Sequence, residues 1–475
     1  MRHLTPYFAL LAALGLTGCA GTATPTGSPP PVAPQWHADL PHAGELGDLR
    51  AWWAQFDDPL LARLVEAGQA ASPTLATAAA NIAEARAARV AGRAALLPTL
   101  DLSASASRGR AEPGAPAGSV ASAALQASWE LDLFGGLRAG ADAAQARLAA
   151  RDAAWHEARV LVAAEVASAY ADLRACEQRR QQLDQDASSR ELTADITEAA
   201  ARVGVRSWVS ADLARASAAE GQVLRQQQQA QCELTVKSLV ALTALGEPEL
   251  RRLLAERTAR LPQPREFAVP GVPAALLAQR PDVHAAGLEL SAASADATQA
   301  DAQRWPRITL AGTVGTARSQ GLGASAEGGV WTLGPVSVTL PLFDGGVRRA
   351  NVEAARARHT AALAVYAARL RTAIEEVERA LVALQATARR SGDALAAERG
   401  YERAYQATAA SYGAGAESLL VLEDARRSLL AAQGTRQALQ RERLAAWIAL
   451  YRATGGGWQA PAVSLTHNAA ATPGL

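Results

Sequence analysis

The residues with the most definite chemistry are three cysteines, at positions 19, 176 and 232. Cys176 lies 28 residues before Gly204, and Cys232 lies 28 residues after it. A glycine between two helical stretches commonly marks a reversal of the chain, so an antiparallel hairpin turning at Gly204 places both thiols at one height on facing helices. In an oxidising compartment such a pair can form a disulfide that pins the hairpin. The alternative is two small buried thiols.

The N-terminus has the pattern of a secretory signal peptide over residues 1–18, with a basic start and an apolar run too short to span a bilayer permanently. It ends in Leu-Thr-Gly-Cys at 16–19, which resembles a bacterial lipoprotein processing box with Cys19 as the lipid-modified residue. A tether rich in Thr, Pro, Gly and Ser follows over 21–34. Ala20 then favours sorting to the outer membrane, by resemblance to other lipoproteins. The alternative is an ordinary signal peptide with an incidental cysteine.

Other chemistry is not indicated by the sequence. The seven histidines lack metal-ligand spacing, and the chain has neither a glycine-rich phosphate loop nor a nucleophile elbow. Adjacent acids such as Glu375 and Glu376 do not share a helix face. A formal net charge of +1 without a basic stripe argues against nucleic-acid binding. We therefore predict no catalytic residue, no metal site and no cofactor, apart from a covalent lipid on Cys19.

Six sequence landmarks recur in the same order at offsets of 208 to 211 residues. The pairs are Pro73 with Pro281, Pro98 with Pro306, Phe134 with Phe343, Glu165 with Glu376, Gly204 with Gly415, and Ser207 with Ser418. Such a series predicts a duplicated unit. Each copy begins with an Ala-rich helix, near 59–97 and 273–304, which a proline ends.

Two alternating segments follow each of these helices. Leu125, Trp129 and Leu131 alternate with polar residues, as expected for a strand with one apolar and one polar face. No stretch of about 18 uninterrupted apolar residues follows the signal peptide, so any membrane span must consist of strands. The alternative is a soluble, half-buried sheet. Four aromatic residues lie near the expected strand ends, where interfacial aromatics of a membrane barrel would sit: Trp129, Phe134, Trp331 and Phe343.

Four strands cannot close a transmembrane barrel, because the smallest closed barrels have about eight and open edges are not tolerated in lipid. Three chains would supply twelve strands. The strand count therefore predicts an oligomer, with a homotrimer as the simplest closed solution.

Long helices are expected after each strand pair, over about 137–202 and 347–412. Both runs lack proline and carry apolar residues at heptad spacing, a pattern typical of coiled coils. Each run would reach roughly 100 Å at 1.5 Å per residue. Gly204, Gly413 and Gly415 then mark reversals into returning helices. The alternative for the heptad stripes is an ordinary helical core.

With these residues in view, the chain resembles the outer-membrane efflux factor family, in its lipoprotein branch that serves resistance-nodulation-division pumps. The most specific stretches are 129–135 (WELDLFG), 279–283 (QRPDV) and 341–346 (PLFDGG). The resemblance implies an α+β membrane protein, a homotrimer with a twelve-stranded outer-membrane barrel continued by a long α-helical barrel in the periplasm. It also implies outer-membrane lipid, a periplasmic adaptor protein and an inner-membrane pump as partners.

The resemblance further implies a periplasmic aperture near the tip of the second helical hairpin. Asp424 matches the aspartate of the family's Leu-Asp-Ala motif, and Leu420 matches an apolar ring one turn earlier. Val421 stands where some relatives carry a second aspartate, so a double acidic ring is not expected. Three symmetry-related carboxylates near an axis favour cations. The alternative for Asp424 is a solvated helix carboxylate.

The expected organisation begins with a signal peptide at 1–18 and a lipidated tether and N-terminal segment at 19–58. A first efflux repeat follows at 59–246, with a β-hairpin at about 99–134 and a helical hairpin turning near 204. After an equatorial linker at 247–272 comes a second repeat at 273–454, with a β-hairpin at about 307–343 and a helical hairpin turning near 413, and then a C-terminal tail at 455–475. The function expected from the resemblance is passive export of small toxic compounds or drugs delivered by the pump. The alternatives are a channel for protein secretion and a purely structural lipoprotein that spans the periplasm.

Overall fold

A computed structural model describes residues 52–53, 56–110, 117–262, 280–321 and 324–458. The signal peptide, Cys19 and the tether lie outside these residues, as do most of the C-terminal tail and part of the equatorial linker. The described chain forms two compact units. The first unit comprises Ala88–Ala146 and Leu290–Ala364, and the second contains the remainder.

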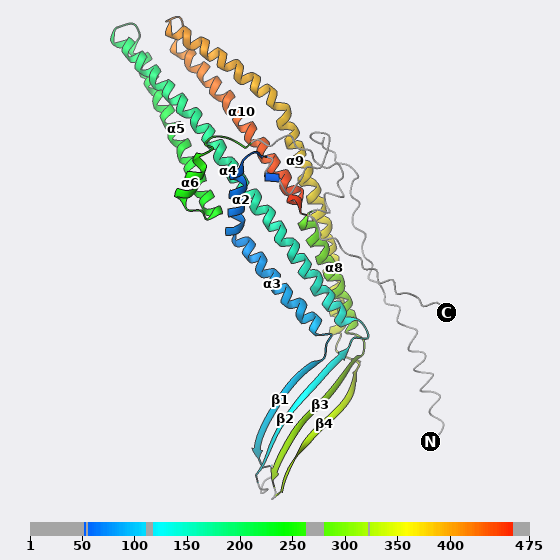
Figure 1. The fold of residues 1–475 in the computed structure, drawn as a ribbon. Helices are drawn as coiled ribbons and strands as arrows, with labels where there is room; N and C mark the ends of the chain where they lie inside the picture. The colour runs from blue at the N-terminus through cyan, green and yellow to red at the C-terminus, as the bar shows by residue number, and fades with distance from the viewer. Residues whose placement is uncertain (1–51, 54–55, 111–116, 263–279, 322–323, 459–475) are drawn as a thin grey trace. The chain divides into compact units, whose positions relative to one another are not determined.

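A four-stranded antiparallel sheet makes up much of the first unit (Figure 1). Its strands are β1 (Thr99–Gly109), β2 (Gly118–Leu131), β3 (Arg307–Gly321) and β4 (Ala324–Thr339), in the spatial order β1-β2-β3-β4. The central β2–β3 pair joins strands from distant parts of the sequence, with Leu125 opposite Val314. The two outer strands, β1 and β4, each have a neighbour on one side only in the described chain.

Eight α-helices are described in the two units together, with one short 3₁₀ helix. The helices are α2 (Pro59–Ala71), α3 (Pro73–Ala94), α4 (Gly136–Arg202), α5 (Trp208–Thr243), α6 (Glu247–Ala255), α8 (Pro281–Ala302), α9 (Val347–Gly413) and α10 (Leu419–Ala453), and the 3₁₀ helix is η3 (Gly455–Gly457). None of the helices in the described ranges has a stretch both long and apolar enough to cross a membrane.

The first Ala-rich helix is two helices, so the prediction of one continuous helix near 59–97 was wrong. Ser72 adopts an extended conformation between α2 and α3, and its hydroxyl accepts a hydrogen bond from the Leu75 backbone N–H at 3.3 Å. Pro73 has no N–H to continue α2 and suits the first turn of a new helix. The proline that the repeat pattern identified therefore starts α3 rather than lying within one long helix.

An aspartate lies shortly before the start of each long helix, and both aspartates belong to the sequence motifs noted above. The Asp132 carboxylate accepts hydrogen bonds from the backbone N–H groups of Leu137 (3.1 Å) and Arg138 (2.9 Å) at the start of α4. Asp344 accepts equivalent bonds from Gly346 (2.9 Å) and Arg348 (3.1 Å) at the start of α9. These backbone hydrogen bonds lower the pKa of Asp344. Both aspartates thus satisfy N–H groups that a helix start leaves without partners.

The main apolar core lies in the second unit, where the heptad seams of α4 and α9 are largely buried. Val166 and Leu173 of α4 lie in this core with Leu381 of α9 and Leu250 of α6. Trp447 of α10 packs there with a ring-centroid distance of 6.2 Å to Trp52. α6 falls within the predicted equatorial linker and contributes three buried leucines, so part of this segment packs on the helices.

Gly68 of α2 provides a test of this packing. A Cβ at this position would lie 2.5 Å from Cγ2 of Val166, a fully buried and β-branched side chain. We expect Gly68→Ala to destabilise the protein by about 1–2 kcal/mol, although alanine favours helices. The matched control is Gly400→Ala in α9, where a Cβ meets nothing within 4 Å; this variant should gain up to about 1 kcal/mol. Thermal unfolding in detergent measures both, and equal shifts would contradict the close approach.

Candidate channel surfaces

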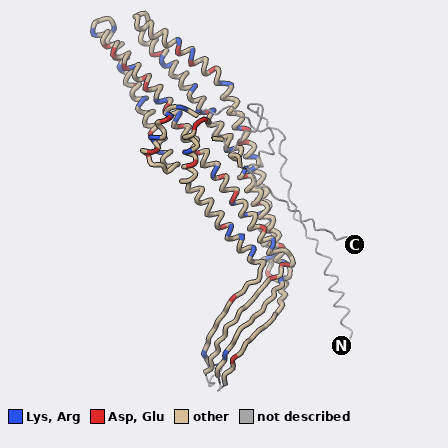
Figure 2. The backbone as a smooth tube through the Cα atoms, viewed as in Figure 1, with Lys and Arg blue, Asp and Glu red and all other residues tan. Residues whose placement is uncertain are grey.

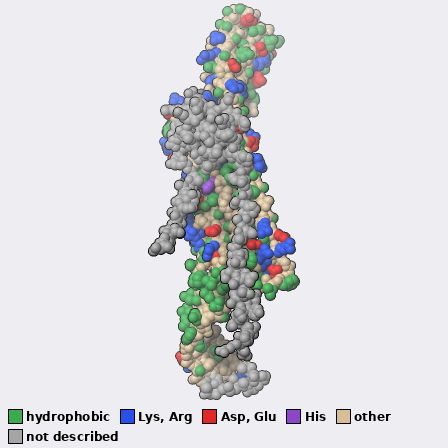
Figure 3. Space-filling view, turned by 90° about the vertical axis from the view of Figure 1, so that its right-hand side faces the viewer, with side chains coloured by type: hydrophobic (Ala, Val, Ile, Leu, Met, Phe, Trp, Pro, Cys, Tyr) green, Lys and Arg blue, Asp and Glu red, His purple; other side chains and the backbone are tan. Residues whose placement is uncertain are grey.

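The strand register divides the sheet into one apolar and one polar face. Leu102 lies opposite Leu125, Leu125 opposite Val314, and Val314 opposite Trp331, and directly opposed residues point to the same side. Their side chains are exposed in the single chain, with Leu102 at 73% and Val314 at 57%. Hydrophobic side chains gather on the part of the sheet that is visible in Figure 3. This face therefore requires an apolar environment from outside the chain.

The opposite face carries small polar and charged groups. The Ser105 and Ser122 hydroxyls lie 2.9 Å apart, and the Thr313 and Thr332 hydroxyls lie 2.6 Å apart. Arg307 forms an ion pair with Glu130 across the β2–β3 pair at 3.3 Å. Figure 2 shows that charges are sparse along the strands and frequent along the helices. The hydroxyl pairs and the Arg307–Glu130 ion pair thus lie on the side opposite to Leu125 and Val314.

The four aromatic residues predicted near the strand ends occupy different positions. Trp129 lies near the end of β2, where its indole N–H donates to the Leu96 carbonyl at 3.0 Å. Phe134 follows β2 and stacks on Trp305 at 5.6 Å between ring centroids. Phe343 follows β4 and is 93% exposed. Trp331 lies in the middle of β4, so its predicted place near a strand end was wrong; the strand begins at Ala324, well before Trp331, and ends at Thr339.

Two glycine turns join the long helices to the returning ones. Gly204 (φ +78°) follows α4 and Gly415 (φ +79°) follows α9, and both adopt the left-handed conformation that glycine allows. The hydroxyls of Ser207 and Ser418 then accept hydrogen bonds from the backbone N–H groups at the third position after each, at the starts of α5 and α10. The α4–α5 and α9–α10 hairpins thus end in matching turns (Figure 1).

The two candidate aperture residues lie in the first turns of α10. Leu420 is 64% exposed. The side chain of Asp424 is 75% exposed and pairs with Arg427 at 3.2 Å. Because they are four residues apart in a helix, the two side chains share a face. This face is therefore largely exposed in the described chain.

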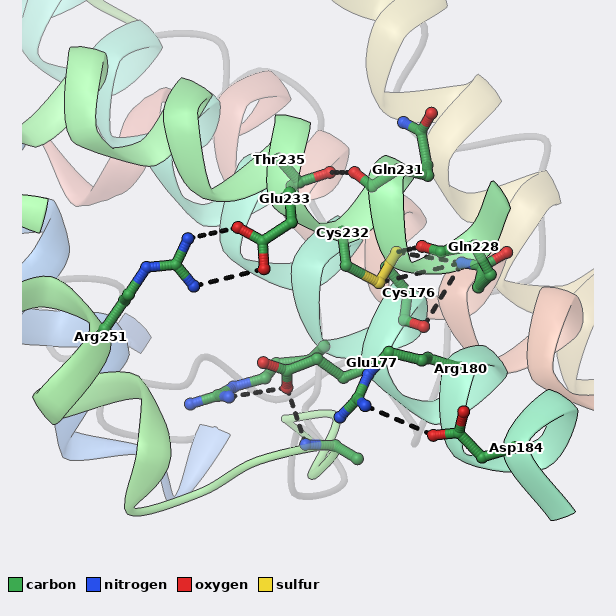
Figure 4. The surroundings of a disulfide bond; sticks show 12 residues. Cys176, Glu177, Arg180, Asp184, Gln228, Gln231, Cys232, Glu233, Thr235 and Arg251 are labelled. Atoms are coloured by element: carbon green, nitrogen blue, oxygen red, sulfur yellow. Dashed lines mark hydrogen bonds and ion pairs between the residues drawn. A yellow bond between two sulfur atoms is a disulfide. The ribbon is translucent and has the colours of Figure 1, made fainter. Parts of the chain in front are cut away.

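The structure brings Cys176 of α4 and Cys232 of α5 to disulfide bonding distance, with their Cα atoms 5.6 Å apart (Figure 4). This Cα separation lies in the normal range for a disulfide. The amide of Gln228 donates to the Cys176 carbonyl at 3.4 Å. Nearby, Arg251 of α6 pairs with Glu233 of α5, one residue after Cys232. Equal spacing from Gly204 therefore placed the two residues correctly at one height of the hairpin.

A buried charged cluster lies closer to the turns, and sequence reasoning missed it. Asp186 and Arg190 of α4 face Glu423 and Arg426 of α10, and their side chains are between 3% and 11% exposed. Charges at such spacing are usually solvated. One signal was present in the sequence: Glu423 lies four residues after Leu419, and Arg426 lies four residues after Leu422, which places all four on one helix face.

Comparison with known proteins agrees with these features. The sequence profile of the outer membrane efflux protein family matches residues 64–245 and 272–456. The chain belongs to this family. It is therefore an efflux channel protein of the outer membrane, in a family of channels rather than enzymes. Outer membrane protein OprJ of Pseudomonas aeruginosa is 32% identical over 95% of both chains. The pyoverdine export protein OpmQ of Pseudomonas putida is 30% identical over 97% of this chain and 98% of its own.

A solved structure shows the same fold. The outer-membrane channel OprN superposes with a TM-score of 0.80 at 29% identity, covering 90% of this chain and 98% of that one. Among the residues that the structure describes in this efflux protein, no group of three or more His, Cys, Asp or Glu is arranged to hold a metal ion.

The Arg280-Pro281-Asp282 stretch of this efflux protein has a packing role. Arg280 donates to the Ala453 carbonyl at 2.9 Å and pairs with Asp282 (2.7 Å) and Glu376 (2.8 Å). Burial lowers the pKa of its guanidinium, but the two carboxylates outweigh burial and hold the pKa above its ordinary value. The motif thus joins the start of α8 to α9 and to the end of α10.

Glu157 lies near this stretch and has an unfavourable setting for its charge. Burial, followed by the charge of Asp282, raises the pKa of the Glu157 carboxyl. A carboxyl whose pKa is higher in the folded state contributes stability at low pH, and this contribution is lost as the pH rises through the folded pKa. Glu157 therefore opposes folding slightly at neutral pH.

Proposed function

We propose that three copies of this chain form a closed twelve-stranded channel in the outer membrane, continued by their helices into the periplasm. The two-faced sheet carries this proposal. Its apolar face requires lipid, its polar face requires water, and β1 and β4 leave edges that a membrane cannot tolerate. Joining β1 of one copy to β4 of the next removes both edges, and three copies reach the size of a water-filled barrel.

The proposed role is export of small toxic compounds or drugs, passed to the channel by an inner-membrane pump through a periplasmic adaptor. The similarity to OprJ and OpmQ over nearly the full length supports it. The chain itself performs no catalysis in this proposal, so energy for transport comes from the pump. Lipidation of Cys19 would add an anchor beside the barrel, and durable anchoring takes more than one acyl chain.

We also infer that the chain arose by duplication of one unit. The order of helix, two strands, long helix and returning helix occurs twice. The long helices α4 and α9 both have 67 residues, and α5 and α10 have 36 and 35. The predicted boundaries at 59–246 and 273–454 follow this order. The proposed gate aspartate, Asp424, belongs to the second copy alone, because Leu213 occupies its corresponding place in the first.

Planar bilayers test the channel directly. Purified trimer should produce stepwise conductance, and a strain that lacks the gene should become more susceptible to several drugs or solvents. Two results together would contradict the proposal: no conductance in any preparation, and a deletion strain whose susceptibility to drugs, solvents and metals is unchanged. If the same strain no longer secreted a particular protein, the protein-export alternative would be favoured instead.

The proposed aperture is the ring formed by Asp424 and Leu420 of three chains. Removing either side chain should widen the constriction, and removing Asp424 should also weaken the preference for cations. We expect Asp424→Ala and Leu420→Ala to raise single-channel conductance by about twofold or more, with reduced cation selectivity in the first variant only. Conductance and reversal potential in a salt gradient measure both. Wild-type values for both variants would exclude these residues from the constriction.

We further propose that Cys176 and Cys232 are oxidised in the periplasm. Intact mass after alkylation should show two protected thiols without reductant and two alkylated thiols with it. The double variant Cys176→Ala/Cys232→Ala should lose about 2–4 kcal/mol of stability, because the disulfide closes a loop between residues 56 apart. Full alkylation of the native protein without reductant would contradict the disulfide.

A further inference from the structure

The buried cluster near the turns contains two cations and two anions, so its formal charge is zero. Within each helix the pairs are close: Arg190 Nε lies 2.7 Å from Asp186, and Arg426 Nη1 lies 2.5 Å from Glu423. Between α4 and α10, Arg426 Nε lies 3.7 Å from Asp186, and Arg190 Nη1 lies 3.9 Å from Glu423. Each cation thus lies near an anion of both helices.

Further groups complete this arrangement, among them the exposed Glu220 of α5, whose carboxylate lies 3.4 Å from Arg190 Nη1. Ser217 of α5 donates its hydroxyl to Glu423 at 2.9 Å and accepts from Arg190 at 3.0 Å. Tyr405 of α9 lies under the Arg426 guanidinium, 5.8 Å from its carbon to the ring centroid. Arg426 also donates to the hydroxyl of Ser189 at 3.1 Å. The cluster therefore connects all four helices of the two hairpins.

Apolar packing is sparse at this level of the hairpins. The buried apolar cluster near the turns consists of Ala194, Ala214, Leu419 and Leu422, and the other buried apolar residues of α4 and α5 nearby are mostly alanines, such as Ala187, Ala201 and Ala211. Gly221 of α5 leaves the space that Arg190 occupies, since a Cβ there would lie 2.8 Å from Arg190 Cδ. Side-chain volume alone thus specifies little about how α10 is set against its neighbours.

The cluster lies on the opposite side of α10 from the two proposed aperture residues. Leu419, Leu422, Glu423 and Arg426 are all buried, at steps of three, one and three residues. At 3.6 residues per turn they occupy one face. Leu420 and Asp424 occupy the other face, at 64% exposure for Leu420 and 75% for the Asp424 side chain.

We propose that Asp186, Arg190, Glu423 and Arg426 are positioning residues that fix the rotation of α10 about its axis and so hold Leu420 and Asp424 toward the channel. This inference rests on the aperture proposed above. A rotation of about one residue, roughly 100°, would expose Glu423, bury Asp424 and separate the buried charges from their partners. An unpaired buried charge is strongly unfavourable, whereas the same rotation would put Leu420 in the place of Leu419, an exchange that conserves apolar volume and costs little. The cluster thus selects one rotation where the apolar core does not.

The rotation of α10 can be measured independently of conductance, from the labelling rates of single cysteines on its two faces. Leu420→Cys places a thiol on the exposed face, and Leu422→Cys places one on the buried face. Each is introduced alone into the full-length trimer, and protein without an added cysteine gives the background rate from the three native cysteines. Labelling by a water-soluble maleimide should be faster at 420 than at 422.

Arg426→Leu should reverse this preference in part. We expect labelling at 422 to accelerate by about tenfold or more and labelling at 420 to slow. Arg426→Lys keeps the charge and should restore the original ratio to within about threefold. The matched control is Arg441→Leu, on the same helix, which removes an ion pair with Asp172 of α4 at 2.6 Å whose side chains are 54% and 43% exposed; it should leave the ratio unchanged.

Three outcomes would overturn the proposal: an unchanged ratio in Arg426→Leu, the same change in Arg441→Leu, or acceleration at 422 without slowing at 420, which indicates fraying of the helix end. If Arg426→Leu yields no trimer, Glu423→Gln provides the same test with a milder change. Wild-type conductance in Asp424→Ala and Leu420→Ala would instead reject the aperture, while the labelling ratio would still report whether the cluster fixes the rotation of α10.

Discussion

Gly315→Val is expected to abolish assembly of folded protein in the outer membrane. Gly315 lies in β3 opposite Ala124 of β2, at the strand pair that joins the two halves of the sheet. A Cβ at this position would lie 2.3 Å from the Ala123 carbonyl oxygen and 2.7 Å from the Ala124 Cα. These are backbone atoms, which cannot move aside without breaking the ladder. We expect a loss of at least about 3 kcal/mol, even though valine favours strands more than glycine does.

The matched control is Gly328→Val in β4. A Cβ there would meet nothing within 4 Å, so this variant adds the same side chain to the same sheet without a clash. Folded protein is measured in outer-membrane fractions by the shift in SDS gel mobility on heating. Gly328→Val should retain the shift, and Gly315→Val should lose it. Equal amounts of folded protein in both variants would show that β2 and β3 do not approach this closely at Gly315.

Periodicity predicted the elements of this fold well, because local patterns determine them. Alternation identified the two faces of the strands, and the observed register places Leu102, Leu125 and Val314 on one side. The proline-free heptad runs predicted α4 and α9 to within a residue or so of their observed ends. The glycines and serines of the turns indicated where these helices reverse.

What the sequence did not show depends on contacts between distant residues. The close approach at Gly315 depends on the small side chains of β2, nearly 200 positions earlier in the chain. Similarly, Arg190 and Arg426 resemble solvated helix residues until α4 and α10 are placed together. Trp331 was placed near a strand end because alternation alone does not define strand length. Local periodicity predicts elements, whereas buried charge requires knowledge of the partner helix.

Arg174 is the largest fully buried cation in the described chain. Its removal is the second change for which we expect a large loss of stability. Its guanidinium pairs with Glu177 at 2.8 Å, donates to the Leu254 carbonyl at 3.0 Å and lies 4.9 Å above the Tyr170 ring. Glu177 also accepts from the Ala259 backbone N–H at 2.7 Å. The pair thus fastens α4 to the end of α6 and to the segment that follows it.

The neighbouring tyrosine extends this network to α2. The Tyr170 hydroxyl donates to Asp58 at 2.7 Å, and Asp58 accepts from the Leu60 backbone N–H at the start of α2. Burial raises the pKa of Tyr170 far above its ordinary value and so favours the protonated hydroxyl that donates to Asp58. Loss of Arg174 would therefore disturb the support of α2 as well as α6.

We expect Arg174→Met to destabilise the protein by about 3–5 kcal/mol, because it leaves the Glu177 charge partly buried without its cation. Arg174→Met/Glu177→Gln should recover part of this loss, since the remaining group is neutral. Arg379→Met is the matched control: Arg379 pairs with Glu375 at 2.6 Å, but the two side chains are 77% and 60% exposed, and the expected change is below about 1 kcal/mol. Urea unfolding in detergent measures all three. If Arg174→Met and Arg379→Met lower the free energy of unfolding equally, burial does not govern the strength of the Arg174 pair. The attachment of α6 must then depend on the apolar contacts of Leu250 and Leu254 instead.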